Sequence, residues 1–196
     1  MTSRREFLEV AALSALPAVA GASLTAGVTG TSPGFHLVLF DERYPQARSV
    51  ATGMNRAGAA VHSLTDGDVT QVWLHQIGPA WQRGPAVIAG LTARPALFCL
   101  EQLALSSGLR VVFHAEHVVH PNGRTHHSLL RGAEGVGLSS ADLTQAGRHW
   151  PARIAEALAT YRPQAVRRRF GRSEAALDPA LPPQAQLLTS WIIAAA

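Results

Sequence analysis

Residues 85–119 read PAVIAGLTARPALFCLEQLALSSGLRVVFHAEHVV, and this stretch decides the fold. It opens with a short apolar run, residues 86–89, which Gly90 closes. Residues 93–105 then carry apolar side chains at helical spacing, and Gly108 marks the end of the predicted helix. A second run, rich in β-branched residues, begins at Arg110. Two apolar strands joined by a helix are best joined in parallel through a right-handed crossover, so this stretch predicts an α/β protein.

The same alternation continues toward the N-terminus. Residues 35–40 and 59–64 predict strands, residues 44–57 predict the helix between them, and residues 69–76 predict a further helix. The resulting order β-α-β-α-β-α-β is typical of a doubly wound, Rossmann-like sheet. We therefore expect a three-layer α/β domain with a mainly parallel sheet of four or five strands.

A β-hairpin is predicted at one edge of this sheet. Asn122-Gly123 lies between two alternating runs, which is a strong short-range hairpin signal. A two-residue turn there pairs Val118 with His127. Further along the chain, residues 187–193 are apolar and predict either an added edge strand or a short helix.

Composition limits the classes of protein that the chain can represent. The 196 residues are 47% hydrophobic and 15% charged, which indicates a globular domain with a substantial core. The net charge is only +4, and the one dense basic cluster, residues 167–172, is interpreted as solvated, so we expect no nucleic-acid partner. Cys99 is the single cysteine, which excludes an internal disulfide. Its apolar neighbours predict that it is buried and unreactive.

The first residues carry the most specific signal in the sequence. Residues 3–8 (SRREFL) precede an Ala-rich apolar run, and residues 18–20 (AVA) offer small side chains for a signal peptidase. This stretch resembles the twin-arginine (Tat) export signal, which implies transport of a folded protein to the periplasm. An amphipathic cytosolic helix and a permanent membrane anchor are the alternative interpretations. We expect residues 1–30 to be a Tat-type signal peptide and linker, residues 31–196 to be a single α/β domain, and no stable membrane span to remain after cleavage.

The carboxyl edge of the predicted sheet is the first candidate site. In open α/β sheets, ligands bind beyond the carboxyl ends of the strands. Gly90 would allow close backbone approach, and Thr92 would either line an anion site or simply cap the following helix. No phosphate-loop, dinucleotide or nucleophile-elbow motif is present. The candidate ligand-binding residues are Asp41, Glu42, Arg43, Gly90 and Thr92.

The histidine-rich hairpin is the second candidate site. Imidazoles with a carboxylate suit a transition metal, which is the one cofactor the sequence suggests. In the predicted register, one face of the hairpin carries the candidate metal ligands His114, Glu116, His120 and His127. Six residues of strand span roughly 20 Å, so His114 and His120 cannot bind the same ion. Acid–base chemistry by a His–Glu pair and a plain polar edge are the alternative interpretations.

These observations leave three alternative hypotheses for the function. The first is an exported accessory, assembly or binding subunit of a Tat-dependent redox system, with a protein partner exported alongside it. The second is a metal-dependent periplasmic enzyme that uses the hairpin histidines. The third is a protein that binds a small anion or another small ligand at the carboxyl edge of the sheet.

Overall fold

The computed structural model describes residues 34–162 and 184–195. The predicted leader and the basic cluster at residues 167–172 lie outside these ranges. The strands are β1 (Leu37–Asp41), β2 (Val61–Leu64), β3 (Ile88–Ala93), β4 (Leu109–Val119), β5 (Thr125–Arg131) and β6 (Gln186–Ala195). The helices are α1 (Pro45–Arg56), α2 (Thr70–Val72), α3 (Gly78–Arg83), α4 (Arg94–Ser106), α5 (Ala133–Val136), α6 (Ser140–Ala146) and α7 (Trp150–Thr160). Three further helical turns are η1 (Thr65–Gly67), η2 (Trp73–Ile77) and η3 (Gly147–His149).

The fold is a mixed α/β fold built on one six-stranded sheet with the order β2-β1-β3-β6-β4-β5. β1 pairs in parallel with β2 and β3, whereas β3–β6, β6–β4 and β4–β5 are antiparallel. The prediction of a mainly parallel sheet is therefore not confirmed. β3 and β4 run in the same direction, as their crossover through α4 predicts, but β6 lies between them.

β6 occupies the middle of the sheet, so its predicted place at an edge is wrong. Seven successive residues of β6 are buried, from Leu188 to Ala194. A strand buried on both faces reads as a continuous apolar run and belongs inside a sheet. The run at residues 187–193 carries that signal, but its length and composition do not say which strands it pairs with.

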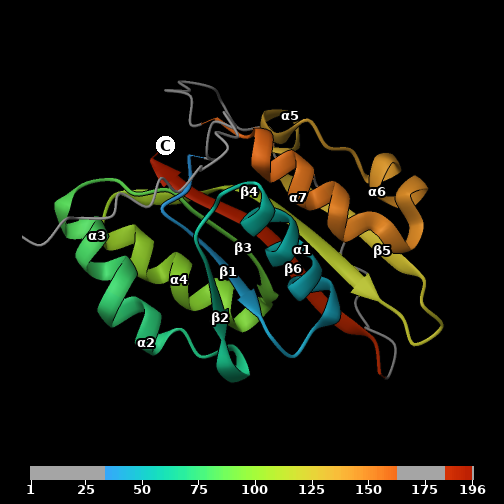
Figure 1. Ribbon diagram of the computed structural model, residues 1–196, viewed down its shortest axis with the longest axis horizontal. Helices are drawn as coiled ribbons and strands as arrows, with labels where there is room; N and C mark the ends of the chain where they lie inside the picture. Colours follow the sequence, from blue (N-terminus) through green and yellow to red (C-terminus); the bar gives the residue numbers. More distant parts are fainter. Residues whose placement is uncertain (1–33, 163–183, 196) are drawn as a thin grey trace, which may run out of the picture.

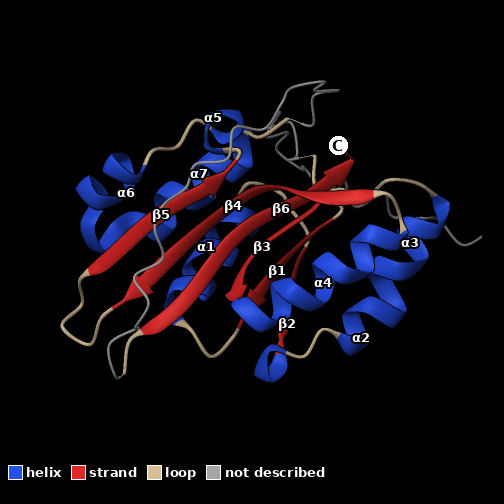
Figure 2. Cartoon of the chain, turned by 180° about the vertical axis from the view of Figure 1, so that it is seen from behind, coloured by secondary structure: helices blue, strands red, loops and turns tan. Residues whose placement is uncertain are grey.

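Helices cover both faces of the sheet (Figures 1 and 2). α1 and α7 pack over one face, where Val38, Leu91 and Ile154 belong to one hydrophobic cluster. α2, α3 and α4 pack over the other, where Leu39 and Leu100 belong to a second cluster. We call these the α7 face and the α4 face.

A bulge in β4 changes which side chains of that strand point to each face of the sheet. Opposite β6, the register shifts between Val111 and Phe113, so Val112 is the extra residue. Val111 belongs to the cluster on the α4 face, whereas Phe113 belongs to the cluster on the α7 face. Because side chains alternate after the bulge, Glu116 faces α4 and His117 faces α7.

The hairpin between β4 and β5 turns through three residues instead of the predicted two. The His120 N–H donates to the Arg124 carbonyl at 2.8 Å, and the Gly123 N–H donates to the His120 carbonyl at 2.9 Å. A two-residue turn at Asn122-Gly123 would require a backbone N–H that Pro121 lacks, whereas its fixed φ suits the second position of a type I turn. Gly123 then takes a left-handed φ of 81°, which completes the three-residue loop.

The predicted hairpin register is consequently wrong by one residue. His127 lies opposite His117, where the two-residue turn placed it opposite Val118. A slip of one residue moves every side chain of a strand to the other face. His127 therefore shares the α7 face with His117 and is separated by the sheet from His114 and Glu116.

The prediction that Cys99 is buried is also wrong, because its side chain is exposed. The buried positions of α4 are Ala96, Leu97, Leu100 and Ala104, which form one helical stripe. Cys99 lies outside this stripe, next to Phe98, which is 60% exposed. The apolar neighbours of Cys99 in the sequence thus belong partly to the outer surface of the helix.

Candidate functional site

A row of buried polar side chains crosses four neighbouring strands on the α4 face. Thr92 pairs with Thr189, Thr189 pairs with Glu116, and Asp41 adjoins Thr92 because Phe40 pairs with Leu91. Asp41, Thr92 and Thr189 are fully buried, and Glu116 is 4% exposed. We call these four residues the polar row. Burying polar groups costs free energy unless each finds a partner, so the partners of this row define the site.

Asp41 ends β1 and is held by the arginine two residues later. The Arg43 guanidinium donates to both carboxylate oxygens of Asp41, at 2.9 Å from Nε and 2.6 Å from Nη2. The Arg43 backbone N–H adds a third bond at 3.2 Å. A Cβ at Gly67 would lie 2.7 Å from Arg43 Nη2, so only glycine lets η1 pass this close to the pair. The forked geometry fixes the guanidinium, whose side chain is 43% exposed.

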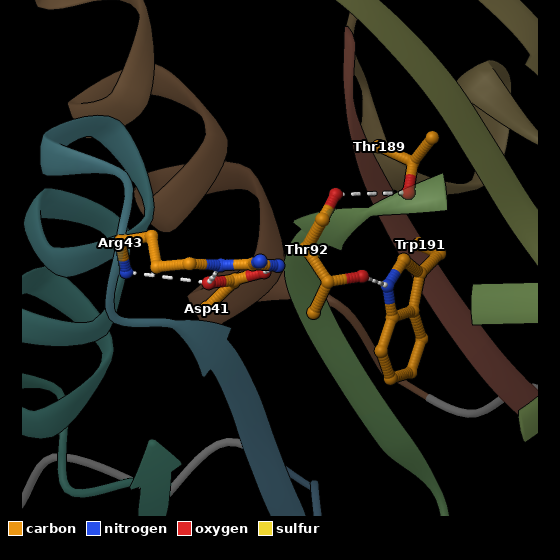
Figure 3. A network of polar contacts seen from close by, with 5 residues as sticks. All are labelled: Asp41, Arg43, Thr92, Thr189 and Trp191. Carbon is orange, nitrogen blue, oxygen red and sulfur yellow. Dashed lines mark hydrogen bonds and ion pairs between the residues drawn. The ribbon is translucent and has the colours of Figure 1, made fainter. Parts of the chain in front are cut away.

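Thr92 joins β3 to β6 and does not cap α4. The Trp191 indole N–H donates to Thr92 Oγ1 at 3.1 Å, and the Thr189 hydroxyl donates to the Thr92 carbonyl at 3.2 Å. Figure 3 shows Thr92 between the Asp41–Arg43 pair on one side and Thr189 and Trp191 on the other. Gly90 makes room for this arrangement, because a Cβ there would lie 2.6 Å from the Trp191 ring.

Glu116 completes the row beside the first residue of α4. Its Oε1 lies 3.4 Å from Nη1 of Arg94, whose side chain is 54% exposed. Within the part of the chain that the structure describes, this oxygen has no hydrogen-bond partner, and neither has the buried Nε2 of His114. Burial lowers the pKa of His114 to about 4, with smaller contributions from Arg94 and Arg131, so this imidazole is neutral at pH 7.

The two arginines and the start of α4 place hydrogen-bond donors at this edge, beside the buried carboxylates of Asp41 and Glu116. Ala93 at the N-cap of α4 supplies no side-chain hydrogen bond, so the first N–H groups of this helix lack a side-chain cap. The positive end of the helix dipole and the guanidinium groups of Arg43 and Arg94 therefore lie along the buried row. We call Asp41, Arg43, Thr92, Arg94 and Glu116 the carboxyl-edge site.

The predicted ligand-binding residues have different places in this structure. The carboxyl-edge site includes three of them, Asp41, Arg43 and Thr92. Gly90 lies on β3 two residues before Thr92, on the same face of the sheet. Glu42 is only partly buried, and it enters the fold through its backbone, whose N–H donates to the Leu64 carbonyl. Its carbonyl accepts from Arg48 on α1.

The predicted metal ligands are not brought together. His114 and Glu116 lie on the α4 face, His127 lies on the α7 face, and His120 begins the hairpin turn. Within residues 34–162 and 184–195, no three His, Cys, Asp or Glu side chains gather in a way that could hold a metal ion. The described residues therefore offer no support for a transition-metal cofactor.

A second polar network, which the sequence did not suggest, is buried on the α7 face. His117 Nε2 lies 2.8 Å from Ser190 Oγ, and His117 Nδ1 lies 2.8 Å from His127 Nδ1. Trp150 of α7 stacks on the His117 ring, with centroids 4.5 Å apart. His117 and Ser190 are fully buried, so a nucleophilic role for Ser190 has no route for a substrate. We interpret this network as structural.

Comparison with protein-family models, with curated proteins and with solved structures finds no match. The function is therefore inferred from the geometry of the chain itself.

Proposed function

We propose that this protein binds a small anionic ligand, through a carboxylate or phosphate group, at the carboxyl-edge site. The observation that carries the proposal is a buried polar row flanked by two half-exposed arginines. Asp41 fixes the Arg43 guanidinium through two hydrogen bonds, and Glu116 lies beside the Arg94 guanidinium. The row therefore positions Arg43 and Arg94 for a further partner.

The arginines retain donors for that partner. Asp41 accepts from Nε and Nη2 of Arg43, and Glu116 approaches only Nη1 of Arg94. A guanidinium carries five N–H donors in a planar fork that matches carboxylate and phosphate oxygens. The unused donors of both arginines, together with the start of α4, supply the hydrogen bonds that such an anion requires.

Replacing Arg94 with glutamine is expected to weaken ligand binding at least about tenfold, because it removes a charge-assisted hydrogen bond. The measurement is thermal unfolding of the full chain with a panel of small carboxylates and phosphates. A ligand at one hundred times its Kd stabilises the folded state by about 2.7 kcal/mol. Arg43→Lys keeps a positive charge beside Asp41 but loses the fork, and it is expected to weaken the same ligand.

Arg110→Gln is the matched control, since Arg110 is an exposed arginine at the start of β4, six residues before Glu116 of the site. This variant is expected to bind as the wild type does. The proposal fails if no member of the panel stabilises the wild-type protein. It also fails if the stabilisation survives unchanged in both Arg94→Gln and Arg43→Lys.

We also propose that the protein works in the periplasm as a binding or accessory subunit of a Tat-dependent system. The Tat-like leader, residues 3–8, supports export. Phe98 and Leu105 support a protein partner, because both lie on α4 and their side chains are 60% and 44% exposed. Among the described residues, no helix is long and apolar enough to cross a membrane.

Changing Arg4 and Arg5 together to lysine is expected to leave precursor in the cytoplasm, because the Tat resemblance rests on this pair. Cell fractionation and immunoblotting measure the distribution of precursor and mature protein. Arg110→Lys, which alters an exposed arginine outside the leader, serves as the control and is expected to be exported normally. Normal periplasmic accumulation of the Arg4/Arg5 variant would remove the basis of the export proposal.

A further inference from the structure

A hollow lies at the tip of the hairpin, beside α6. It is a cavity of about 320 Å³, within the lower range of small-ligand pockets. All of its described lining residues carry hydrogen-bonding side chains: His120, Asn122, Arg124, Thr125, His126 and Thr144. We call this cavity the hairpin pocket.

The lining has the chemistry of a site for oxyanions. Arg124 contributes a permanent positive charge, and His120 and His126 each contribute a ring N–H. Asn122 Oδ1 accepts the Arg124 backbone N–H at 3.0 Å, which orients the amide and leaves its NH₂ group as a donor. None of the described lining residues is a carboxylate.

The acidic residue of α6, Asp142, already has hydrogen-bond partners. The Asp142 carboxylate accepts from the Ser139 backbone N–H at 2.9 Å and from the Ser139 hydroxyl at 2.7 Å. The Ser139 side chain in turn accepts from the Asp142 N–H, so the two residues form a capping box at the start of α6. Asp142 is thereby held at the cap of α6 and is not paired with Arg124.

The turn geometry fixes the pocket in place. The three-residue loop sets Arg124 directly opposite His120, and α6 brings Thr144 to the same hollow. His120 lies four residues beyond Glu116, which is about 13 Å along the strand. The hairpin pocket is therefore separate from the carboxyl-edge site.

We infer that the hairpin pocket binds an oxyanion group, the phosphate or carboxylate of a small polyanionic organic molecule. The inference goes beyond the proposed function, because it assigns a second site with different residues. The cavity has room for a molecule larger than one inorganic ion.

The test is calorimetric titration of the full chain with pyrophosphate and, separately, with citrate at constant ionic strength. At least one probe is expected to bind saturably, and Arg124→Gln is expected to weaken that binding at least about tenfold. His120→Gln and His126→Gln are expected to weaken it less. Binding of pyrophosphate alone identifies phosphate esters as the ligand class, and binding of citrate alone identifies polycarboxylates.

Two arginine variants distinguish binding in the hairpin pocket from binding elsewhere on the protein. Arg110→Gln and Arg94→Gln are both expected to leave the hairpin binding unchanged. The inference is overturned if neither probe binds saturably, or if Arg110→Gln weakens binding as much as Arg124→Gln does. Binding that depends on Arg94 and not on Arg124 would also overturn it, while supporting the carboxyl-edge site. Arg124 is exposed, so thermal unfolding of Arg124→Gln is expected to match the wild type.

Discussion

Gly132→Ala is expected to destabilise the protein by about 3 kcal/mol or more. Gly132 follows β5 with a left-handed φ of 67°, a conformation that costs an L-residue about 1–2 kcal/mol. A Cβ at this position would lie 2.0 Å from the carbonyl oxygen of Val112. Val112 lies within β4, between the paired residues Val111 and Phe113, so its backbone carbonyl cannot move aside without disturbing the strand.

Gly137→Ala provides a matched control for this prediction. Gly137 also has a left-handed φ, 63°, but a Cβ there meets nothing within 4 Å. The substitution is expected to cost about 1 kcal/mol, the conformational part alone. Urea unfolding of both variants measures the difference, which isolates the steric contribution. Equal losses for the two variants would mean that the approach of Gly132 to the bulge does not contribute to stability.

The elements of the fold follow from local sequence patterns, whereas the order of the strands does not. The helix predicted over residues 93–105 is α4, and the run that begins at Arg110 is β4. The run predicted over residues 86–89 overlaps only the start of β3, which continues through Gly90 to Ala93. Periodicity reports which faces of a segment are buried, and it identified these elements. It carries no information about partners remote in the sequence, which is why the insertion of β6 between β3 and β4 was not predicted.

The sequence predicted the residues of the carboxyl-edge site as two separate sets, which it did not connect. The rule for strand ends selected Asp41, Arg43 and Thr92, while the hairpin pattern selected Glu116 as part of a metal site. β6 joins the two sets into one row through Thr189, and only the strand order shows this. The signal for Arg94 was present in the sequence, because it opens the helix that follows Thr92.

The error in the hairpin has a single local cause. Asn122-Gly123 is a strong turn signal, but the residue before it is Pro121, which cannot donate the hydrogen bond that a two-residue turn needs. Weighing Pro121 would have predicted the three-residue loop. It would also have placed His127 opposite His117, which is the basis of the buried network.

Acidification from pH 7 to pH 5 is expected to lower the free energy of unfolding by several kcal/mol because of this network. Burial lowers the pKa of His117 well below its usual value, and the neighbouring imidazoles of His127 and His114 lower it further. Burial likewise lowers the pKa of His127 to about 4, with His126 adding to the effect. Both pKa values therefore lie below 7, so both rings are neutral in the folded protein at pH 7, with their Nδ1 atoms 2.8 Å apart.

Proton linkage gives the direction in which the free energy of unfolding changes with pH. The unfolded chain binds protons at these histidines below about pH 6.5, whereas the folded chain does so only near pH 4 or below. Stability is therefore fully present above pH 6.5 and is lost as the pH falls toward the pKa of the folded state. His127 alone accounts for at most about 2 kcal/mol of this loss at pH 5. His114 acts in the same direction, since burial also lowers its pKa to about 4.

Urea unfolding at pH 7, 6 and 5 measures this dependence in a window above the titration of Asp68 and Asp142, whose pKa values are both lowered by hydrogen bonds. His127→Gln is expected to reduce the pH slope, because it removes one buried imidazole that the unfolded chain protonates. His36→Gln is the control, since His36 is exposed, and it is expected to leave the slope unchanged. A wild-type stability that does not change between pH 7 and pH 5 would show that the buried histidines gain protons in the folded state as readily as in the unfolded one.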